Sequence, residues 1–117
     1  MFRERLTEIR RVVAGAQVVC LAAGDGIAVE TVGGEDLDVE VLVAEFVAMA
    51  KGVASEQRAI GVGETVRLEI ETKEWVVILH RLRGDYYLVL ALEAGQPVGR
   101  ARFELQRAAP RFENELA

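Results

Sequence analysis

Residues 39–54, VEVLVAEFVAMAKGVA, constrain the fold most, because as a helix they have two sides that both favour burial. On a helical wheel, one wide apolar arc is sufficient to cover one face of a β-sheet. That arc contains Val39, Leu42, Val43, Phe46, Val47, Met49, Ala50, Val53 and Ala54. The opposite arc holds small or apolar residues among only a few charges, namely Val41, Ala44, Ala48 and Gly52. Small side chains three to four residues apart let a second helix approach closely. We therefore expect a second copy of this chain to cover the opposite arc.

Hydrophobic periodicity predicts eight elements in the order α-β-β-α-β-β-β-α. Helices are expected at 2–14, from 39 to about 56, and at about 97–116, with Pro110 kinking the last one or starting a fresh final turn. Strands are expected at 17–23, 27–32, 61–71, 75–82 and 86–92. Tight turns at Gly24-Asp25-Gly26, at 72–74 and at 83–85 join strands as hairpins. The sequence thus predicts a single α+β domain over residues 1–117, with a five-stranded, largely antiparallel sheet. The middle helix covers one face of this sheet and the two terminal helices cover the other.

Composition excludes several classes of function. The formal charge of the chain is −5 and no run of Lys or Arg is longer than Arg10–Arg11, so nucleic-acid binding is not expected. No segment reaches the roughly 18 uninterrupted apolar residues of a membrane span. The charged start, MFRERLTEIRR, does not resemble a secretory signal. The single cysteine, Cys20, excludes an internal disulfide and a multi-cysteine metal site. We expect a cytoplasmic protein without a metal or cofactor.

No set of residues predicts catalysis. The glycine-rich turns at 24–26 and 61–63 lack the Lys of a phosphate-binding loop, so nucleotide binding is not expected. Cys20 and His80 lack an orienting acid and are interpreted as structural. Four carboxylates around the third and fourth strands are interpreted as a solvated face: Glu64, Glu69, Glu71 and Glu74. The arginines of the last helix suggest either a patch for an acidic partner or, as we favour, a solvated face: Arg100, Arg102, Arg107 and Arg111.

The third strand is the natural edge of the predicted sheet. Residues 64–71 contain neither Pro nor an obvious bulge, so this edge is expected to pair antiparallel with its copy across a two-fold axis. With Leu68 near the axis, Arg67 would face Glu69 of the second copy, a pair that contributes roughly 0.2–1 kcal/mol. The predicted dimer interface comprises Val41, Ala44, Glu45, Ala48 and Gly52 on the helix and Val66, Arg67, Leu68, Glu69 and Ile70 on the strand.

Several phrases in this order resemble the roadblock (dynein light-chain) family, in particular its bacterial MglB-like branch. They are VAGAQ at 13–17, AAGDGIAVE at 22–30, IGVGETVRLEIET at 60–72 and PVGRAR at 97–102. The resemblance covers nearly the whole chain. It implies homodimers or heterodimers in which middle helices pack together and third strands pair. It also implies binding to Ras-like small GTPases, with no active site in the chain itself. MglB-like proteins stimulate GTP hydrolysis without inserting an arginine finger.

The favoured function is therefore a non-catalytic homodimeric regulator or scaffold that binds a Ras-like small GTPase, with GTPase activation of the MglB type as one form of that role. Two alternatives have no GTPase partner. One is a dimeric module that assembles larger complexes. The other is a sensor domain that holds a small molecule between sheet and helix.

Overall fold

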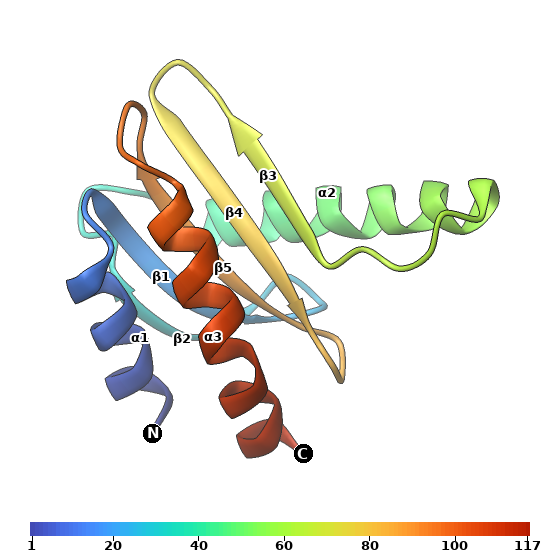
Figure 1. The fold of residues 1–117 in the computed structure, drawn as a ribbon, viewed down its shortest axis with the longest axis horizontal. Coiled ribbons are helices and arrows are strands. Elements are labelled where there is room, and N and C mark those ends of the chain that lie inside the picture. Colours follow the sequence, from blue (N-terminus) through green and yellow to red (C-terminus); the bar gives the residue numbers. More distant parts are fainter.

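A computed structural model describes all residues, 1–117, and contains the eight predicted elements in the predicted order. Figure 1 shows α2 on one face of a five-stranded sheet and α1 and α3 on the other. The elements are α1 (Phe2–Val12), β1 (Ala16–Ala23), β2 (Ala28–Gly33), α2 (Val39–Ile60), β3 (Arg67–Glu71), β4 (Trp75–Leu82), β5 (Tyr86–Glu93) and α3 (Gly99–Leu116). The strand order is β2-β1-β5-β4-β3 and every neighbouring pair is antiparallel. The predicted fold class is confirmed.

The sheet has a separate apolar core on each face, because the side chains of a strand alternate between its two faces. In β4, Val76, Ile78 and Leu82 join the core beneath α1 and α3. Val77 and Leu79 join the core beneath α2. β1 and β5 contribute to both cores, which explains why their sequences are apolar at nearly every position. The central strands are thus covered on both faces.

Two element boundaries differ from the prediction in ways that affect the rest of the molecule. α2 continues past Glu56 to Ile60 and ends where Gly61 adopts a left-handed conformation (φ 70°). The third strand begins at Arg67 instead of 61, because Gly61 and Gly63 both have positive φ and interrupt an extended backbone. The result is a longer helix and a shorter edge strand than expected.

The terminal helices are slightly shorter than predicted, since α1 ends at Val12 and α3 begins at Gly99. α3 runs through Pro110 as one helix, so no fresh turn starts there, and a kink at Pro110 stays a prediction. Proline removes the hydrogen bond to the carbonyl four residues earlier, at Gln106. Because Gln106 and Pro110 are both exposed, water can satisfy that carbonyl.

Candidate self-association surface

α2 faces the sheet through one narrow stripe. The helix begins at Asp38, whose side chain accepts a hydrogen bond from the Val41 backbone N–H at 3.3 Å, as an N-cap does. Its buried residues are Val43, Val47 and Ala50, which pack on the core of that sheet face. At about 100° per residue, these three side chains lie within roughly 60° of one another on the helix. This stripe marks the side of α2 that faces the sheet.

A second apolar stripe follows one flank of α2. Leu42 and Phe46 are half-buried, whereas Met49 is 41% exposed, Val53 37% and Ile60 70%. The prediction that Met49 and Val53 belong to the core arc is wrong. They lie roughly 80–120° around the helix from Val43, too far to reach a sheet that the helix meets through one stripe. The flank is thus partly covered at Leu42 and Phe46 by its own chain, whereas Met49, Val53 and Ile60 are left largely uncovered.

The predicted interface residues of α2 lie on its outward side. Val41, Ala44, Glu45, Ala48 and Gly52 are all exposed, as the sequence interpretation requires. A Cβ added at Gly52 would meet no atom within 4 Å. On the helical wheel most of this set lies opposite the buried stripe, and Glu45 and Gly52 border the apolar flank. Contact of this set with a second copy stays a prediction.

The last ten residues of α2 extend past the sheet. Figure 1 shows this end of the helix projecting beyond β3, the edge strand. Ala50 is the last buried residue of the helix, although Ala54 and Gln57 continue the same stripe. Residues 51–60 span about 15 Å of helix at 1.5 Å per residue. That length equals about three strand spacings of 4.8 Å. The overhanging half of α2 has the pattern of a helix that packs on a sheet, but no sheet of its own beneath it.

β3 forms hydrogen bonds with β4 on one side only, so its other backbone edge is free. Leu68 packs against the core beneath α2, whereas Glu69 points to the opposite face. There its carboxylate accepts two hydrogen bonds from Arg102 of α3, one of them at 2.8 Å, and a third from Arg67 at 3.1 Å. The bond from Arg102 lowers the pKa of Glu69. Glu69 thus ties α3 to the edge strand and is half-buried, so its assignment to a solvated face is wrong.

The residues considered for catalysis lie apart. Cys20 is fully buried in the core beneath α2, where burial raises the pKa of its thiol. His80 lies opposite Arg67 on the neighbouring strand, and the charge of Glu113 on α3 acts on its pKa. It therefore lies on the sheet face that α1 and α3 cover. Burial lowers its pKa and favours the neutral imidazole. No three His, Cys, Asp or Glu side chains gather where they could hold a metal ion. None of the helices is long and apolar enough to cross a membrane.

Comparisons with known proteins identify the fold. No protein-family model and no curated protein sequence matches the chain. Among solved structures, a Roadblock/LC7 domain from Streptomyces avermitilis superposes with a TM-score of 0.88 at 11% identity, over 97% of this chain and 95% of that one. This chain has a roadblock/LC7 fold. An MglB structure with a tetrameric arrangement gives 0.85 at 16% identity, over 96% and 85% of the two chains. MglC from Myxococcus xanthus gives 0.74 at 27% identity, over 97% and 98%.

The resemblance seen in the sequence is thus confirmed, since both roadblock and MglB structures share this fold. The sequence interpretation missed the flank of α2 within the roadblock/LC7 fold. A signal for it was present, because Leu42, Phe46, Met49, Val53 and Ile60 follow the alternating spacing of a helix that packs against another helix. The single apolar arc predicted from the helical wheel contained both this flank and the stripe that faces the sheet, so the two were not told apart.

Proposed function

We propose that this chain forms a two-fold symmetric homodimer through α2 and β3. We further propose that the dimer is a non-catalytic regulator or scaffold of a Ras-like small GTPase. The overhang of α2 carries the first part of the proposal. A second copy whose β3 pairs with this β3 would place its own sheet beneath residues 51–60. The two sheets would then form one continuous surface, with two α2 helices side by side upon it.

Two features of the chain support a symmetry axis near residue 51 in the proposed dimer. The first is the end of the buried stripe at Ala50, which marks where the sheet of the same chain ends beneath the helix. The second is the order of apolar residues on the flank. In an antiparallel pair of helices centred on residue 51, Met49 faces Val53 of the second copy and Leu42 faces Ile60. Four of the five flank residues therefore face one another about the point at which the overhang begins, and Phe46 faces Glu56 of the second copy.

A GTPase partner is supported by the fold and by the sequence resemblance to the MglB-like branch, whose members bind such partners. In the proposed dimer the two α2 helices meet along the flank instead of the outward set, so Val41 and Ala48, which the sequence interpretation assigned to the dimer contact, would stay accessible beside the helix pair. They would form a platform without any catalytic group, consistent with a partner that carries its own active site. A cytoplasmic location and a single domain over residues 1–117 fit this role and stay predictions.

The dimer is tested by sedimentation equilibrium of the wild-type chain and three Ala or Val to Glu variants. Val53→Glu places a charge in the proposed helix pair and should give a folded monomer, because an unpaired buried carboxylate is costly. Ala14→Glu, at an exposed position in the turn before β1, is the matched control and should stay dimeric. Ala48→Glu places the same charge on the outward side of α2 and should stay dimeric. The opposite result, a monomeric Ala48→Glu chain and a dimeric Val53→Glu chain, would mean that the helices meet through the outward side. A monomeric wild-type chain would overturn the proposal.

The GTPase part is tested with immobilised wild-type protein and lysate of the source organism loaded with GDP or a non-hydrolysable GTP analogue. Mass spectrometry should identify a Ras-like GTPase, retained more strongly in one nucleotide state. The dimeric Ala48→Glu chain should retain less of it if the outward platform is the contact. Retention of no GTPase in either state would contradict this part and leave the dimer proposal intact.

An assembly role is the second candidate. It is favoured by the MglB neighbour, whose structure has a tetrameric arrangement. A stable dimer that retains other roadblock-fold chains and no GTPase would support this role. The small-molecule sensor has less support, because buried apolar side chains fill the space between α2 and the sheet.

A further inference from the structure

The two edges of the sheet differ in how open they are to a further strand. β3 forms an uninterrupted antiparallel ladder with β4, and no side chain donates to or accepts from a backbone group of β3. An open edge of this kind is a template for pairing with another strand. In the proposed dimer the two β3 edges cover each other, so the two β2 strands become the outer edges of the joined sheet. The state of the β2 edge therefore determines whether the sheet can grow further.

Thr31 presents its backbone groups to the open side of β2. In an antiparallel pair of strands, hydrogen-bonded residue pairs alternate with pairs that are not hydrogen-bonded. The Gly34 N–H donates to the Gln17 carbonyl at 2.8 Å, so along the register the pair of Cys20 and Thr31 is not hydrogen-bonded. The N–H and the carbonyl of Thr31 therefore point away from β1, to the side where an incoming strand would bind them.

Arg3 of α1 already binds the outward carbonyl of Thr31. Its Nη1 donates to that carbonyl at 3.1 Å and to the carboxylate of Glu30 at 3.0 Å. Figure 1 shows α1 beside β1 and β2, with its first turn near β2. That turn is fixed in place, because the ring of Phe2 stacks on the ring of Phe112 with centroids 5.8 Å apart. The helix thus holds the guanidinium at the edge of the sheet.

The ladder of β2 is also interrupted. The register pairs Leu21 with Glu30 and Ala22 with Ala28, so Val29 is an extra residue and forms a β-bulge. Bulges and charged side chains are two means by which natural sheets keep an edge from pairing. β2 has a bulge and a charged side chain bonded to an outward carbonyl, whereas β3 has neither of these two features. The two edges of one sheet are therefore treated in opposite ways.

We propose that Arg3 and Glu30 form an edge-blocking pair, which prevents a second copy of this chain from adding its own β2 to this edge. Two β2 strands could otherwise pair antiparallel about Thr31 across a two-fold axis and extend the sheet beyond the proposed dimer. The pair itself adds little to stability, because its side chains are 65% and 36% exposed. The same contact would block a monomeric chain, so the inference does not depend on the dimer or on a GTPase.

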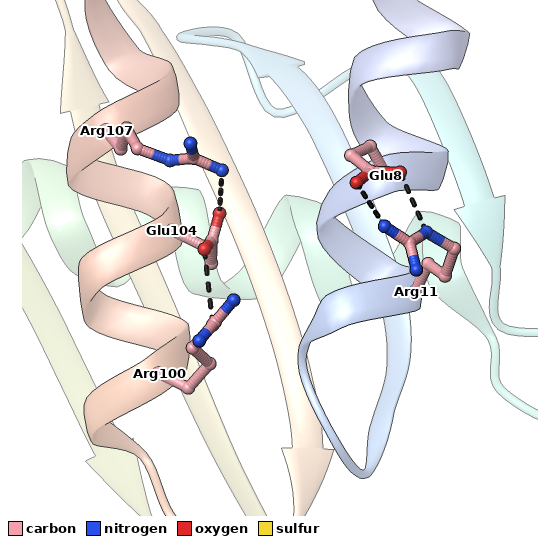
Figure 2. Close-up of polar contacts among 5 residues, drawn as sticks. All are labelled: Glu8, Arg11, Arg100, Glu104 and Arg107. Atoms are coloured by element: carbon pink, nitrogen blue, oxygen red, sulfur yellow. Dashed lines mark hydrogen bonds and ion pairs between the residues drawn. The ribbon is translucent and has the colours of Figure 1, made fainter.

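The test removes the edge-blocking pair without changing the net charge of the chain. A double variant with Arg3→Met and Glu30→Gln deletes the donor and its carboxylate, while methionine keeps an apolar stem. The matched control carries Arg11→Met and Glu8→Gln on the same helix. Figure 2 shows that pair, in which Arg11 donates two hydrogen bonds to Glu8, at 2.9 and 2.5 Å, and none to a strand. Glu30→Gln alone leaves the donor on Thr31 and should behave as wild type.

Sedimentation velocity should show the double variant in species of at least double the wild-type mass, in a proportion that rises with concentration. The control and Glu30→Gln alone should keep the wild-type mass, and far-UV circular dichroism should show the same fold in all chains. In the larger species the amide of Thr31 should exchange hydrogen at least about tenfold more slowly than in wild type, because a second β2 covers it. Adding Val29→Lys should restore the wild-type mass, since a charge at the edge opposes pairing.

A double variant that keeps the wild-type mass would overturn the proposal, and so would equal growth of the control. Growth that leaves the exchange of Thr31 unchanged, or that Val29→Lys does not reverse, would assign the assembly to another surface and overturn it as well. An unfolded double variant would show that the pair is needed for folding, which also contradicts the proposal. A monomeric wild-type chain would contradict the dimer alone, since removal of the pair should then still produce dimers joined through β2.

Discussion

Ile60 offers a quantitative test of the overhang, because it is folded into α2 yet almost uncovered. Its side chain is 70% exposed in one chain, and the proposed dimer places it against Leu42 of the second copy. Full burial of an isoleucine is worth about 1.5–3 kcal/mol, so covering the exposed part contributes roughly 1–2 kcal/mol. Two symmetric copies give roughly 2–4 kcal/mol per dimer, and each 1.4 kcal/mol is about tenfold in affinity. Ile60→Ser should therefore raise the dimer dissociation constant by about 30- to 700-fold.

The assay is sedimentation velocity of a fluorescently labelled chain over a dilution series that crosses the dissociation constant. Ile27→Ser is the matched control, because Ile27 is 66% exposed and precedes β2, the edge strand farthest from β3. The control should leave dimerisation unchanged, and far-UV circular dichroism should show that both variants keep the wild-type fold. An unchanged dissociation constant for Ile60→Ser, or an equal change for Ile27→Ser, would refute the argument from the overhang.

Three other variants test the fold by urea and thermal unfolding. Arg102→Ala should cost about 1–2 kcal/mol, since it removes two charged hydrogen bonds from the half-buried Glu69, whereas Arg111→Ala, at an exposed position without an ion pair, should cost little. The pKa of Glu69 is lowered from the ordinary 4.5 of a glutamate, so the stability of the wild type should decrease as the pH falls from 4.5 through the pKa of the folded state. Arg102→Ala should lack this decrease in stability. The pKa of buried His80 is also lowered, so protonation below its ordinary value of 6.5 favours unfolding, and His80→Gln should weaken this acid dependence; an identical pH profile would contradict the assignment. Phe112→Ala should cost about 3–5 kcal/mol, because its ring is fully buried, and a smaller cost would indicate a loosely packed core under α3.

Much of the fold could be predicted from local patterns. Turn residues such as Asp25-Gly26 and Gly84-Asp85 mark hairpins, because these turns require positive φ, which Gly26, Gly84 and Asp85 adopt. Continuous apolar runs in β1 and β5 predicted strands covered on both faces, which the two cores confirm. Turns and strands of this kind depend on residues that are adjacent in the sequence, so they could be predicted without the structure.

The features that the sequence did not reveal depend on where elements meet. The width of the apolar arc on α2 does not tell how wide a stripe the sheet covers, so Met49 and Val53 were assigned to the core although they are exposed. Glu104 and Glu69 are buried or half-buried carboxylates that look like surface residues in sequence. The packing of α3 against the rest of the chain covers them and brings Arg102 to Glu69, and the ion pairs with Arg107 and Arg102 offset the cost of burying the two carboxylates.

Cross-linking between two differently substituted chains tests the two-fold contact most directly. A Met49→Cys chain is mixed with a Val53→Cys chain, equilibrated and treated with a short bis-maleimide, while native Cys20 stays buried. The proposed register places these two positions opposite each other, so the mixture should give a covalent dimer whose linked peptides join residue 49 to residue 53. An Ile27→Cys chain treated in the same way should give none. No 49–53 cross-link in the mixture, with dimerisation intact, would contradict the proposed packing of α2 against its copy.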